Sequence, residues 1–519
     1  MKPNNDISTF DGGLTLVAYK HLSTGSAIST LPPSKEYIIP MQQHMGVAST
    51  VVIKAGDKIR KGQMLAKPGD IISAAIHSPV SGIITAVKPH QVPHASGLED
   101  LCVFIENDFK DEWIDRQPLA DRYNETSSHD LRKIVTDAGI VGLGGAAFPA
   151  SVKQTEINIK TLILNGAECE PYISCDDVLM RERAEEILSG ADIIGHIVKA
   201  RQCIIAIENN KPEAIKAIQA AIDKDGTGFF SITVIPSIYP SGGEKQLIKI
   251  ITGDEVPVKR YPAELGILVH NVATAYAIHR AIYFAEPLIS RITTVTGHGV
   301  KQPQNVEVLN GTPMRECIEY CGGYNDNSDE LIMGGPMMGF SITSDSVPVV
   351  KASNCLLVTA KDENKQNPNH LPCIRCGKCV DVCPVRLLPQ QLYWYASSRH
   401  TDRLIEHNLF DCIECGCCAY VCPSDIPLVE YYRYAKTHIW QQERERKTSD
   451  IARQRYEAHQ QRIEEQKRLR EEKLREKREL LKSKNNDDAG SDKDSKKAAI
   501  AEAIARAQAK KKERLAADK

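Results

Sequence analysis

The pattern of apolar and polar positions changes along this chain, and it predicts a series of modules that combine strands and helices. Residues 46–88 and 289–350 contain short apolar alternations separated by glycine-containing turns, which is typical of strands. Residues 131–138 have helical spacing, whereas residues 161–164 (Thr-Leu-Ile-Leu) form a short apolar run that predicts a buried strand. We therefore expect α+β and α/β folds in separate domains rather than one repeated architecture.

The pattern changes in the last third of the chain. Residues 387–410 have helical rather than strand character. From residue 441 onward Glu, Lys, Arg, Gln and Ala dominate and apolar positions are sparse, which predicts a solvated, charged helix. Disorder is expected around residues 485–496, followed by a short final helix near Ile500.

Composition and charge exclude several classes of protein. The 519 residues are 42% hydrophobic and 25% charged, as in ordinary soluble proteins. No stretch approaches the roughly 18 consecutive apolar residues of a membrane-spanning helix, and the first residues lack the apolar region of a secretory signal. Residues 441–519 carry 24 Lys and Arg against 17 Asp and Glu, a net charge of +7, and the rest of the chain has a net charge of −9. The basic tail is either a solvated extension or a contact for anionic lipid headgroups or a partner protein.

The cysteines are concentrated in one region, because nine of the sixteen lie between Cys373 and Cys422. Without an export signal, this distribution favours reduced thiolates at a metal centre over disulfides. Two runs, which begin at Cys373 and Cys412, both obey the spacing C-x2-C-x2-C-x3-C-P. This spacing is typical of [4Fe–4S] clusters, in which three close cysteines wrap the cube and a fourth comes from elsewhere.

The two runs predict two [4Fe–4S] clusters with crossed ligands, because in two-cluster ferredoxins the fourth cysteine of each run binds the other cluster. The predicted ligands are Cys373, Cys376, Cys379 and Cys422 for the first cluster, and Cys412, Cys415, Cys418 and Cys383 for the second. A structural zinc site is the alternative, but zinc usually takes separated cysteine pairs rather than two runs that end in Cys-Pro. Cys417 is surplus, and we expect it to be packed without binding metal.

Glycine-rich turns in the middle of the chain point to a ligand that carries phosphate. Gly142, Gly144 and Ala147 have the spacing of the dinucleotide fingerprint G-x-G-x-x-A. That fingerprint must follow a strand, and here the preceding segment has helical spacing, so the context does not support an ordinary Rossmann site. A backbone nest for phosphate is still physically sensible, and a plain loop is the alternative. A second glycine turn, at residues 239–245, precedes a helix predicted over residues 246–252.

Polar residues follow the strand predicted at residues 161–164. They are Asn165, Glu168 and Glu170. In open α/β sheets, ligands bind outside the carboxyl ends of the strands. Carboxylates there accept hydrogen bonds from ribose or ribityl hydroxyls, and Lys153 is placed to face a phosphate.

The glycine-rich and acidic segments also resemble those of a known family. The runs Gly-Leu-Gly-Gly-Ala-Ala-Phe-Pro-Ala-Ser-Val-Lys and Asn-Gly-Ala-Glu-Cys-Glu-Pro resemble the flavin-binding segments of the NADH-oxidising flavoprotein subunit of respiratory complex I. With the order of all the motifs, residues 9–435 resemble the C subunits of Rnf (Rsx) ion-translocating electron transport complexes. The resemblance implies FMN and NADH at residues 139–275, with contacts from Gly142, Gly144, Gly145, Lys153, Asn165, Glu168 and Glu170. Leu143 departs from the complex I turn, which carries an arginine there.

The resemblance also implies a multidomain organisation that mixes α+β and α/β folds. We expect a lipoyl-like barrel-sandwich module within residues 1–125, an FMN/NADH-binding α/β domain over 126–285, a β-grasp domain over 286–360, a helical two-cluster ferredoxin domain over 361–440, and a charged helical or disordered tail over 441–519. The barrel-sandwich module is expected to be a docking fold rather than a carrier, because Lys67 lacks the Met-Lys-Met context of an acylated lysine.

The function implied by the resemblance is that of a peripheral electron-input subunit. It would pass electrons from NADH or ferredoxin through two [4Fe–4S] clusters in a membrane-bound complex that translocates ions. Its expected partners are the membrane subunits of that complex and ferredoxin or another iron–sulfur protein, at the cytoplasmic face of a bacterial inner membrane. No nucleic-acid partner is expected, because the basic tail has no aromatic interleaving. Two alternatives are a soluble NADH oxidoreductase of the diaphorase type and a non-enzymatic, cluster-bearing redox scaffold.

Overall fold

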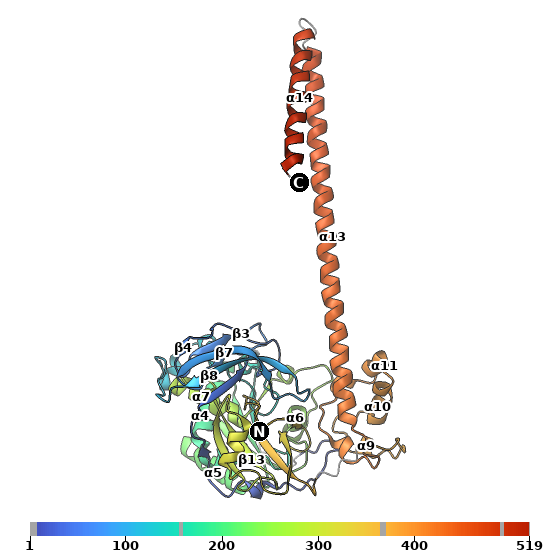
Figure 1. The fold of residues 1–519 in the computed structure, drawn as a ribbon. Coiled ribbons are helices and arrows are strands. Elements are labelled where there is room, and N and C mark those ends of the chain that lie inside the picture. The colour runs from blue at the N-terminus through green and yellow to red at the C-terminus, as the bar shows by residue number, and fades with distance from the viewer. Residues whose placement is uncertain (1–7, 155–158, 364–369, 488–492, 518–519) are drawn as a thin grey trace. The chain divides into compact units, whose positions relative to one another are not determined.

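The computed structural model describes residues 8–154, 159–363, 370–487 and 493–517. By its internal contacts the chain divides into two units, Met1–Lys436 and Thr437–Lys519. The first unit contains four modules, which follow one another along the chain and are coloured from blue to orange in Figure 1. We name them the N-terminal module (residues 20–107), the α/β domain (120–284), the mixed-sheet domain (290–360) and the cysteine module (370–436). None of the helices in the described ranges is both long and apolar enough to cross a membrane.

The N-terminal module consists of two small sheets of mostly antiparallel strands around one apolar core. One sheet has the order β2-β8-β7-β4 and the other β3-β5-β6. Tyr37, Leu65, Ile84 and Ile105 are fully buried between them. The elements are η1 (Lys20–Leu22), β1 (Ser29–Thr30), β2 (Glu36–Pro40), β3 (Thr50–Val51), β4 (Lys58–Ile59), β5 (Met64–Lys67), β6 (Ile76–His77), β7 (Gly82–Gln91) and β8 (Glu99–Asn107).

The α/β domain is built on a parallel sheet with the order β11-β10-β9-β12. Its strands are apolar on both faces, as expected for a parallel sheet that helices cover on each side. The predicted strand at 161–164 is confirmed as part of β9, and the predicted helix at 246–252 as part of α6. The elements are η2 (Ala120–Glu125), α1 (Ser128–Asp137), α2 (Ala150–Lys153), β9 (Thr161–Gly166), α3 (Cys175–Glu182), α4 (Ala184–Val198), β10 (Gln202–Glu208), α5 (Pro212–Asp225), β11 (Phe230–Ile235), α6 (Glu244–Thr252), η3 (Pro262–Leu265), β12 (Ile267–Asn271) and α7 (Val272–Phe284).

The mixed-sheet domain has a six-stranded sheet with the order β1-β14-β13-β17-β15-β16. Strand β1 comes from the N-terminal part of the chain and pairs in parallel with β14, so the domain is completed by a segment far away in sequence. The elements are β13 (Ser290–Thr296), β14 (Gln304–Leu309), α8 (Met314–Tyr320), β15 (Ser328–Met333), β16 (Phe340–Ile342) and β17 (Cys355–Ala360).

The cysteine module is made of short helices, which confirms the helical character predicted between the two cysteine runs. The elements are α9 (Lys378–Asp381), α10 (Pro389–Ser397), α11 (Thr401–Glu406), η4 (Leu409–Asp411) and α12 (Cys417–Tyr420). Helix α13 (Leu428–Asp487) begins in this module, and α14 (Lys493–Ala517) follows it.

The tail differs from the prediction at one point. Disorder is predicted for residues 485–487 and 493–496, but they are helical, and the rest of that stretch lies outside the described residues. The correction has a physical reason, because Lys, Glu, Arg, Ala and Leu, which surround this stretch, have high helix propensity.

Lys351 joins three of the modules through its buried side-chain amino group. Its Nζ donates to the carbonyl oxygens of Ala75 and Gly139, each at 2.7 Å, and its backbone N–H donates to Gln43 Oε1 at 3.2 Å. The residue is 1% exposed. Burial lowers the pKa of Lys351 to about 7 from the ordinary value of 10.5. The junction is therefore made by an amine that is largely neutral above pH 7.

We expect Lys351 to add stability as the pH rises from 7 to 9, so the stability of the wild type should increase relative to that of Lys351→Met over this range. In the unfolded chain this lysine, with a pKa of 10.5, holds its proton over the whole range, whereas the folded form releases it above about pH 7. Unfolding then takes up a proton, which adds about 1.4 kcal/mol of stability per pH unit for one group. Urea midpoints across this range measure the slope, with the exposed Lys301→Met as control. An unchanged slope in Lys351→Met contradicts the assignment.

Candidate functional site

The glycine loop, residues 142–148, connects α1 to α2, so a helix precedes it, as the sequence predicts. The N–H of Gly142 donates to the Phe148 carbonyl at 2.7 Å, and the N–H of Ala147 donates to the Gly142 carbonyl at 3.2 Å. Gly144 and Gly145 are exposed at the tip. Gly145 has φ +115°, and a Cβ added there would have no heavy atom within 4 Å. The tip therefore presents backbone that a ligand can approach closely.

Two buried polar side chains, those of Thr274 and Arg291, form hydrogen bonds with the backbone of this loop. The N–H of Leu143 donates to Thr274 Oγ1 at 2.9 Å, and Arg291 Nη2 donates to the Leu143 carbonyl at 2.5 Å. Arg291 also lines a cavity of about 50 Å³ together with Asp176. Arg291 Nε and Nη1 and Asp176 Oδ1 have no hydrogen-bond partner among the described residues, so the cavity suits ordered water. No sequence pattern pointed to Arg291, which belongs to β13 in the next domain.

The carboxyl ends of two neighbouring strands meet beneath the loop. Asn165 of β9 is aligned with Asn271 of β12. Asn165 Nδ2 donates to the Gly242 carbonyl at 2.9 Å, which ties β9 to the second glycine turn. Asn271 Nδ2 donates to Asp176 Oδ2 at 2.6 Å, and a Cβ added at Gly144 would lie 3.4 Å from Asn271 Cβ. The structure thus brings the loop, Asn165 and the second glycine turn to one edge of the sheet.

Lys153 lies at the same edge, at the end of α2. Its Nζ donates to Glu244 Oε1 at 2.6 Å and to the Val269 carbonyl at 3.3 Å. The side chains of Lys153 and Glu244 are 33% and 39% exposed, so this ion pair is accessible to solvent and contributes little to stability. An accessible ammonium group beside a glycine turn is suited to a phosphate.

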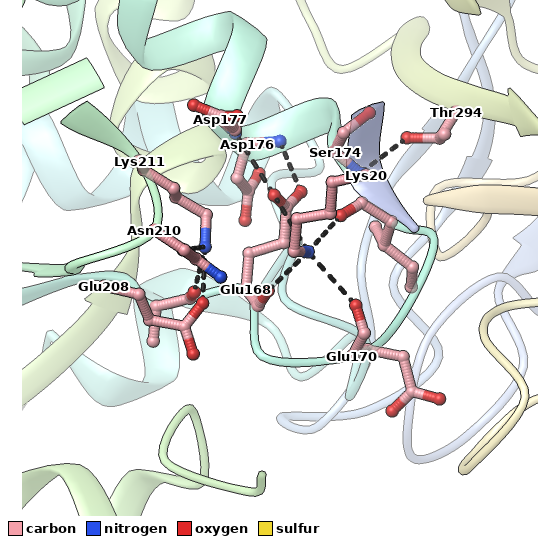
Figure 2. A network of polar contacts seen from close by, with 12 residues as sticks. Lys20, Glu168, Glu170, Ser174, Asp176, Asp177, Glu208, Asn210, Lys211 and Thr294 are labelled. Atoms are coloured by element: carbon pink, nitrogen blue, oxygen red, sulfur yellow. Dashed lines mark hydrogen bonds and ion pairs between the residues drawn. The ribbon is translucent and has the colours of Figure 1, made fainter. Parts of the chain in front are cut away.

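Glu168 turns its carboxylate away from the sheet edge and towards α3. The residue has φ +45°, and its Oε1 and Oε2 accept from the N–H groups of Asp176 and Asp177 at 2.7 Å and 3.4 Å. It therefore caps the first turn of α3 (Figure 2). Burial raises the pKa of Glu168 to about 7. Its contact with a ligand hydroxyl, implied by the resemblance, stays a prediction.

The Glu170 carboxylate contacts the mixed-sheet domain rather than α3. Its Oε1 accepts from the N–H groups of Met337 and Met338, at 2.7 Å and 3.1 Å, in the mixed-sheet domain. Burial raises the pKa of Glu170. The two acidic residues thus hold the turn after β9 between α3 and the mixed-sheet domain.

Two buried lysines bind the backbone of this turn, and sequence reasoning missed both. Lys20 Nζ donates to the carbonyl oxygens of Glu168 and Glu170, at 2.7 Å and 3.1 Å, and also to that of Ile173 (Figure 2). Lys211 Nζ donates to the Ala167 carbonyl at 2.7 Å and forms a fully buried ion pair with Glu208. Because the carbonyl oxygens that these lysines bind are far from them in sequence, no local pattern identifies these contacts.

Glu168, Cys175 and Asp176 form a compact group whose ligand atoms all lie within 4.8 Å of one another. The Lys20 ammonium lies 3.7 Å from Glu168 Oε2, and both Glu168 oxygens already accept backbone N–H groups. A cation there would compete with these donors, so we assign the group a supporting role.

Four of the predicted cluster ligands line one cavity at the surface of the cysteine module. The cavity has a volume of about 200 Å³, and its lining includes Cys373, Cys376, Cys379 and Cys422. Cys376 is exposed, and Arg375 lies over the ring of Trp394 at 5.3 Å on the same wall. We name this the outer cysteine set. It contains three cysteines of the first run and the last cysteine of the second run.

The other four predicted ligands line a narrower cavity of about 20 Å³. They are Cys383, Cys412, Cys415 and Cys418, and we name them the inner cysteine set. The surplus Cys417 is fully buried, as expected for a packed thiol, and it also lines this cavity. Apolar side chains that include Leu387, Leu392 and Val429 form the rest of the wall.

The inner set adjoins the α/β domain. Tyr239, at the start of the second glycine turn, is buried, and its hydroxyl donates to the Cys415 carbonyl at 2.6 Å. Tyr239 also packs with Cys415, Cys417 and the partly buried Cys169 in one apolar cluster. The Cys169 Sγ accepts from the N–H of Gly242 at 3.3 Å. The inner set is therefore in direct contact with the turns that surround the candidate ligand edge.

Four protein families match successive parts of the chain. They are the RnfC barrel sandwich hybrid domain over residues 8–110, the Nuo51 FMN-binding domain over residues 135–280, the SLBB domain over residues 292–341 and the 4Fe-4S dicluster domain over residues 372–426. These matches support a flavin and iron–sulfur clusters as the cofactors of the chain.

The chain is also similar to proteins named as the C subunits of ion-translocating oxidoreductase complexes. The Pseudomonas aeruginosa relative is 44% identical over 460 residues, which are 88% of this chain and 59% of the relative. The Vibrio cholerae relative is 43% identical over 510 residues, 97% of this chain and 64% of the relative. The chain thus spans less than two thirds of the length of these two relatives.

One solved structure and a third relative are also similar to the chain. An NAD⁺-reducing [NiFe]-hydrogenase structure is 19% identical, with a TM-score of 0.41 over 56% of this chain and 55% of that chain. The relative from Yersinia pestis bv. Antiqua is 44% identical over 464 residues, 89% of this chain and 74% of the relative. At that identity and coverage, the chain belongs to the family of ion-translocating oxidoreductase complex C subunits.

Proposed function

We propose that this chain is the peripheral electron-input subunit of a membrane-bound complex that couples electron transfer to ion translocation. The observation that carries the proposal is the contact between the inner cysteine set and the flavin-type domain, made by Tyr239 and its neighbours. Electron transfer between two redox centres requires them to be close, and the contact made by Tyr239 supports a short separation between the two proposed sites. The resemblance of the whole chain to the C subunits supports the same function.

The donor sets fit iron–sulfur clusters. The outer cavity is lined by four cysteines and the inner cavity by five, of which Cys417 is the surplus one, so each offers the four thiols that a [4Fe–4S] cluster requires. We propose that Cys373, Cys376, Cys379 and Cys422 hold one cluster, and that Cys412, Cys415, Cys418 and Cys383 hold the other. The apolar wall of the inner cavity would exclude water from its cluster, which is one of the factors that set a cluster's reduction potential.

The edge of the α/β sheet fits FMN. The exposed tip at Gly144 and Gly145 offers close backbone approach, Lys153 offers a positive charge for the phosphate, and Asn165 offers an amide at the strand end. When bound, a flavin supplies the exchange between a two-electron hydride donor and single-electron carriers. Glu168, Glu170, Lys20 and Arg291 fix the loops on which this edge is built. We propose NAD(H) as the hydride partner.

The outer cysteine set is proposed to exchange electrons with a protein partner. Leu371 and Ile374, which flank it, are 59% and 66% exposed. Exposed apolar side chains beside a redox centre suit docking of ferredoxin or another iron–sulfur protein. Attachment at the cytoplasmic face of the membrane would then come from partner subunits, assisted by contact of the basic tail with lipid headgroups.

Anaerobic reconstitution with iron, sulfide and FMN tests the proposal on the full chain. We expect about eight irons and one FMN per chain, with the flavin absorbance bleached by NADH. The bleaching is expected because the tip of the glycine loop, Gly144 and Gly145, is exposed and therefore accessible to NADH. Eight irons without an NADH-reducible flavin would leave only a cluster-bearing scaffold, and the flavin site would have to be withdrawn.

A further inference from the structure

The first described residues of the chain lie between the α/β domain and the cysteine module. Leu14 and Tyr239 exchange two backbone hydrogen bonds, each at 2.8 Å. The N–H of the adjacent Gly13 donates to the Val382 carbonyl at 3.0 Å. Val382 immediately precedes Cys383 of the inner set. We name residues 10–16 the strap, because they bond to both sides of the interface that the proposed electron path crosses.

Two adjacent glycines permit this close packing. Gly12 has φ +67°, and a Cβ added there would lie 2.6 Å from the carbonyl carbon and oxygen of Val382. Gly13 has φ +82°, and its added Cβ would lie 2.8 Å from the Tyr239 carbonyl oxygen. Both distances are too short for a real side chain against backbone atoms. The strap is therefore packed backbone to backbone on both of its neighbours.

Charged side chains join the same three segments around the strap. Asp11 Oδ2 lies 3.1 Å from Lys249 Nζ of α6 and 3.6 Å from Arg386 Nε, which follows Cys383. Glu255 bridges the same two cations, at 2.6 Å from Lys249 and 2.8 Å from Arg386. The Lys249 ammonium beside Asp11 lowers the pKa of that carboxyl. These pairs are partly exposed, so they orient the strap more than they stabilise the protein.

We infer that the strap is a positioning element, which fixes the separation between the flavin-type site and the inner cysteine set and thereby sets the rate of electron transfer between them. The inference rests on the proposed function. Tyr239 bonds to the strap through its backbone and to the Cys415 carbonyl through its hydroxyl, so this one residue connects the strap to the inner cysteine set. Any shift of the strap against Val382 is transmitted to Cys383 through a single peptide bond.

Gly12→Ala tests the inference, and Gly56→Ala is its matched control. Gly56 also has a left-handed backbone, with φ +90°, but an added Cβ there meets no heavy atom within 4 Å. In the reconstituted full chain, flavin is reduced photochemically and the rate of cluster reduction is followed by absorbance and electron paramagnetic resonance. Because the rate of electron tunnelling falls exponentially with the distance between two redox centres, we expect the Gly12→Ala rate to fall severalfold. The Gly56→Ala rate should equal that of the wild type.

Three further readouts separate positioning from loss of structure. FMN affinity and iron content should change equally in Gly12→Ala and Gly56→Ala, whereas the melting temperature should fall further in Gly12→Ala because of its steric conflict with Val382. Gly13→Ala, which displaces the strap from Tyr239 instead of Val382, should slow the same step. If Gly12→Ala loses the inner cluster, Asp11→Asn replaces it as the decisive variant, because it removes the charge without steric strain and should slow the step by a smaller factor.

The outcomes distinguish this inference from the proposed function. Wild-type rates in Gly12→Ala and Gly13→Ala with both clusters present overturn the role of the strap and leave the electron-input function intact. If Gly12→Ala loses the inner cluster, a wild-type rate in Asp11→Asn also overturns the role of the strap and leaves the electron-input function intact. A wild-type protein whose flavin never reduces its clusters overturns the proposed function itself. A slower step in the strap variants alone supports both.

Discussion

Replacing Cys383 with serine should damage the same cluster as replacing Cys412, although Cys383 belongs to the other cysteine run. The reason is geometric, because Cys383 lines the inner cavity together with Cys412, Cys415 and Cys418. By the same argument, Cys422→Ser should damage the cluster that Cys373→Ser damages, since both thiols line the outer cavity. Each variant should lose about four of about eight irons, and the losses should fall into two classes with two distinct paramagnetic spectra.

Iron and sulfide analysis, combined with electron paramagnetic resonance of the reduced protein, measures this grouping. Cys417→Ala is the matched control, because Cys417 is fully buried beside the inner set but is surplus to its four ligands. It should keep both clusters. If Cys383→Ser instead groups with Cys373→Ser, the ligands are not crossed and each run holds its own cluster. If Cys417→Ala loses the inner cluster, Cys417 is a ligand in place of one of its neighbours.

The cysteine sets show what local spacing predicts well. Three ligands of each set lie within seven residues, so their convergence follows from a short loop, and the fourth follows from the known pairing of such runs. The helical spacer between the runs was also visible in the sequence, because residues 387–410 contain a helical arrangement of apolar side chains. What the spacing could not reveal is which set adjoins the α/β domain. That depends on Tyr239, which lies 176 residues before Cys415.

The residues that hold the loops around the candidate ligand edge could not be predicted from the sequence. Lys20 binds the backbone of residues that follow it by 148 to 153 positions, and Arg291 binds Leu143 across a separation of 148 residues. A buried lysine or arginine looks like any surface charge until the fold shows its partners. The positions of Glu168 and Glu170 after β9 predicted carboxylates that face a ligand, and this stays a prediction. The sequence did not reveal that Glu168 also accepts hydrogen bonds from the backbone of Asp176 and Asp177 in α3.

Gly145→Ala should lower the affinity for FMN by about 10- to 100-fold while both iron–sulfur clusters remain. The added Cβ meets no protein atom within 4 Å, so its conflict is with the ligand that approaches the open tip of the loop. The loss corresponds to one or two backbone hydrogen bonds to a charged group, each worth about 1.5 kcal/mol, and about 1.4 kcal/mol is tenfold in affinity. Quenching of flavin fluorescence on titration of the apoprotein with FMN measures the affinity.

Gly226→Ala separates this effect from backbone strain. Gly226 ends α5 in the same domain with φ +63°, and an added Cβ there also has no heavy atom within 4 Å. Both variants therefore carry an L residue at positive φ, and Gly145→Ala should lose more stability because its φ of +115° lies outside the allowed left-handed region. Only Gly145 lies at the ligand edge, so only Gly145→Ala should weaken FMN binding. Equal FMN affinities in the two variants would mean that the glycine loop is a plain connection between α1 and α2, and that flavin, if bound, is held elsewhere.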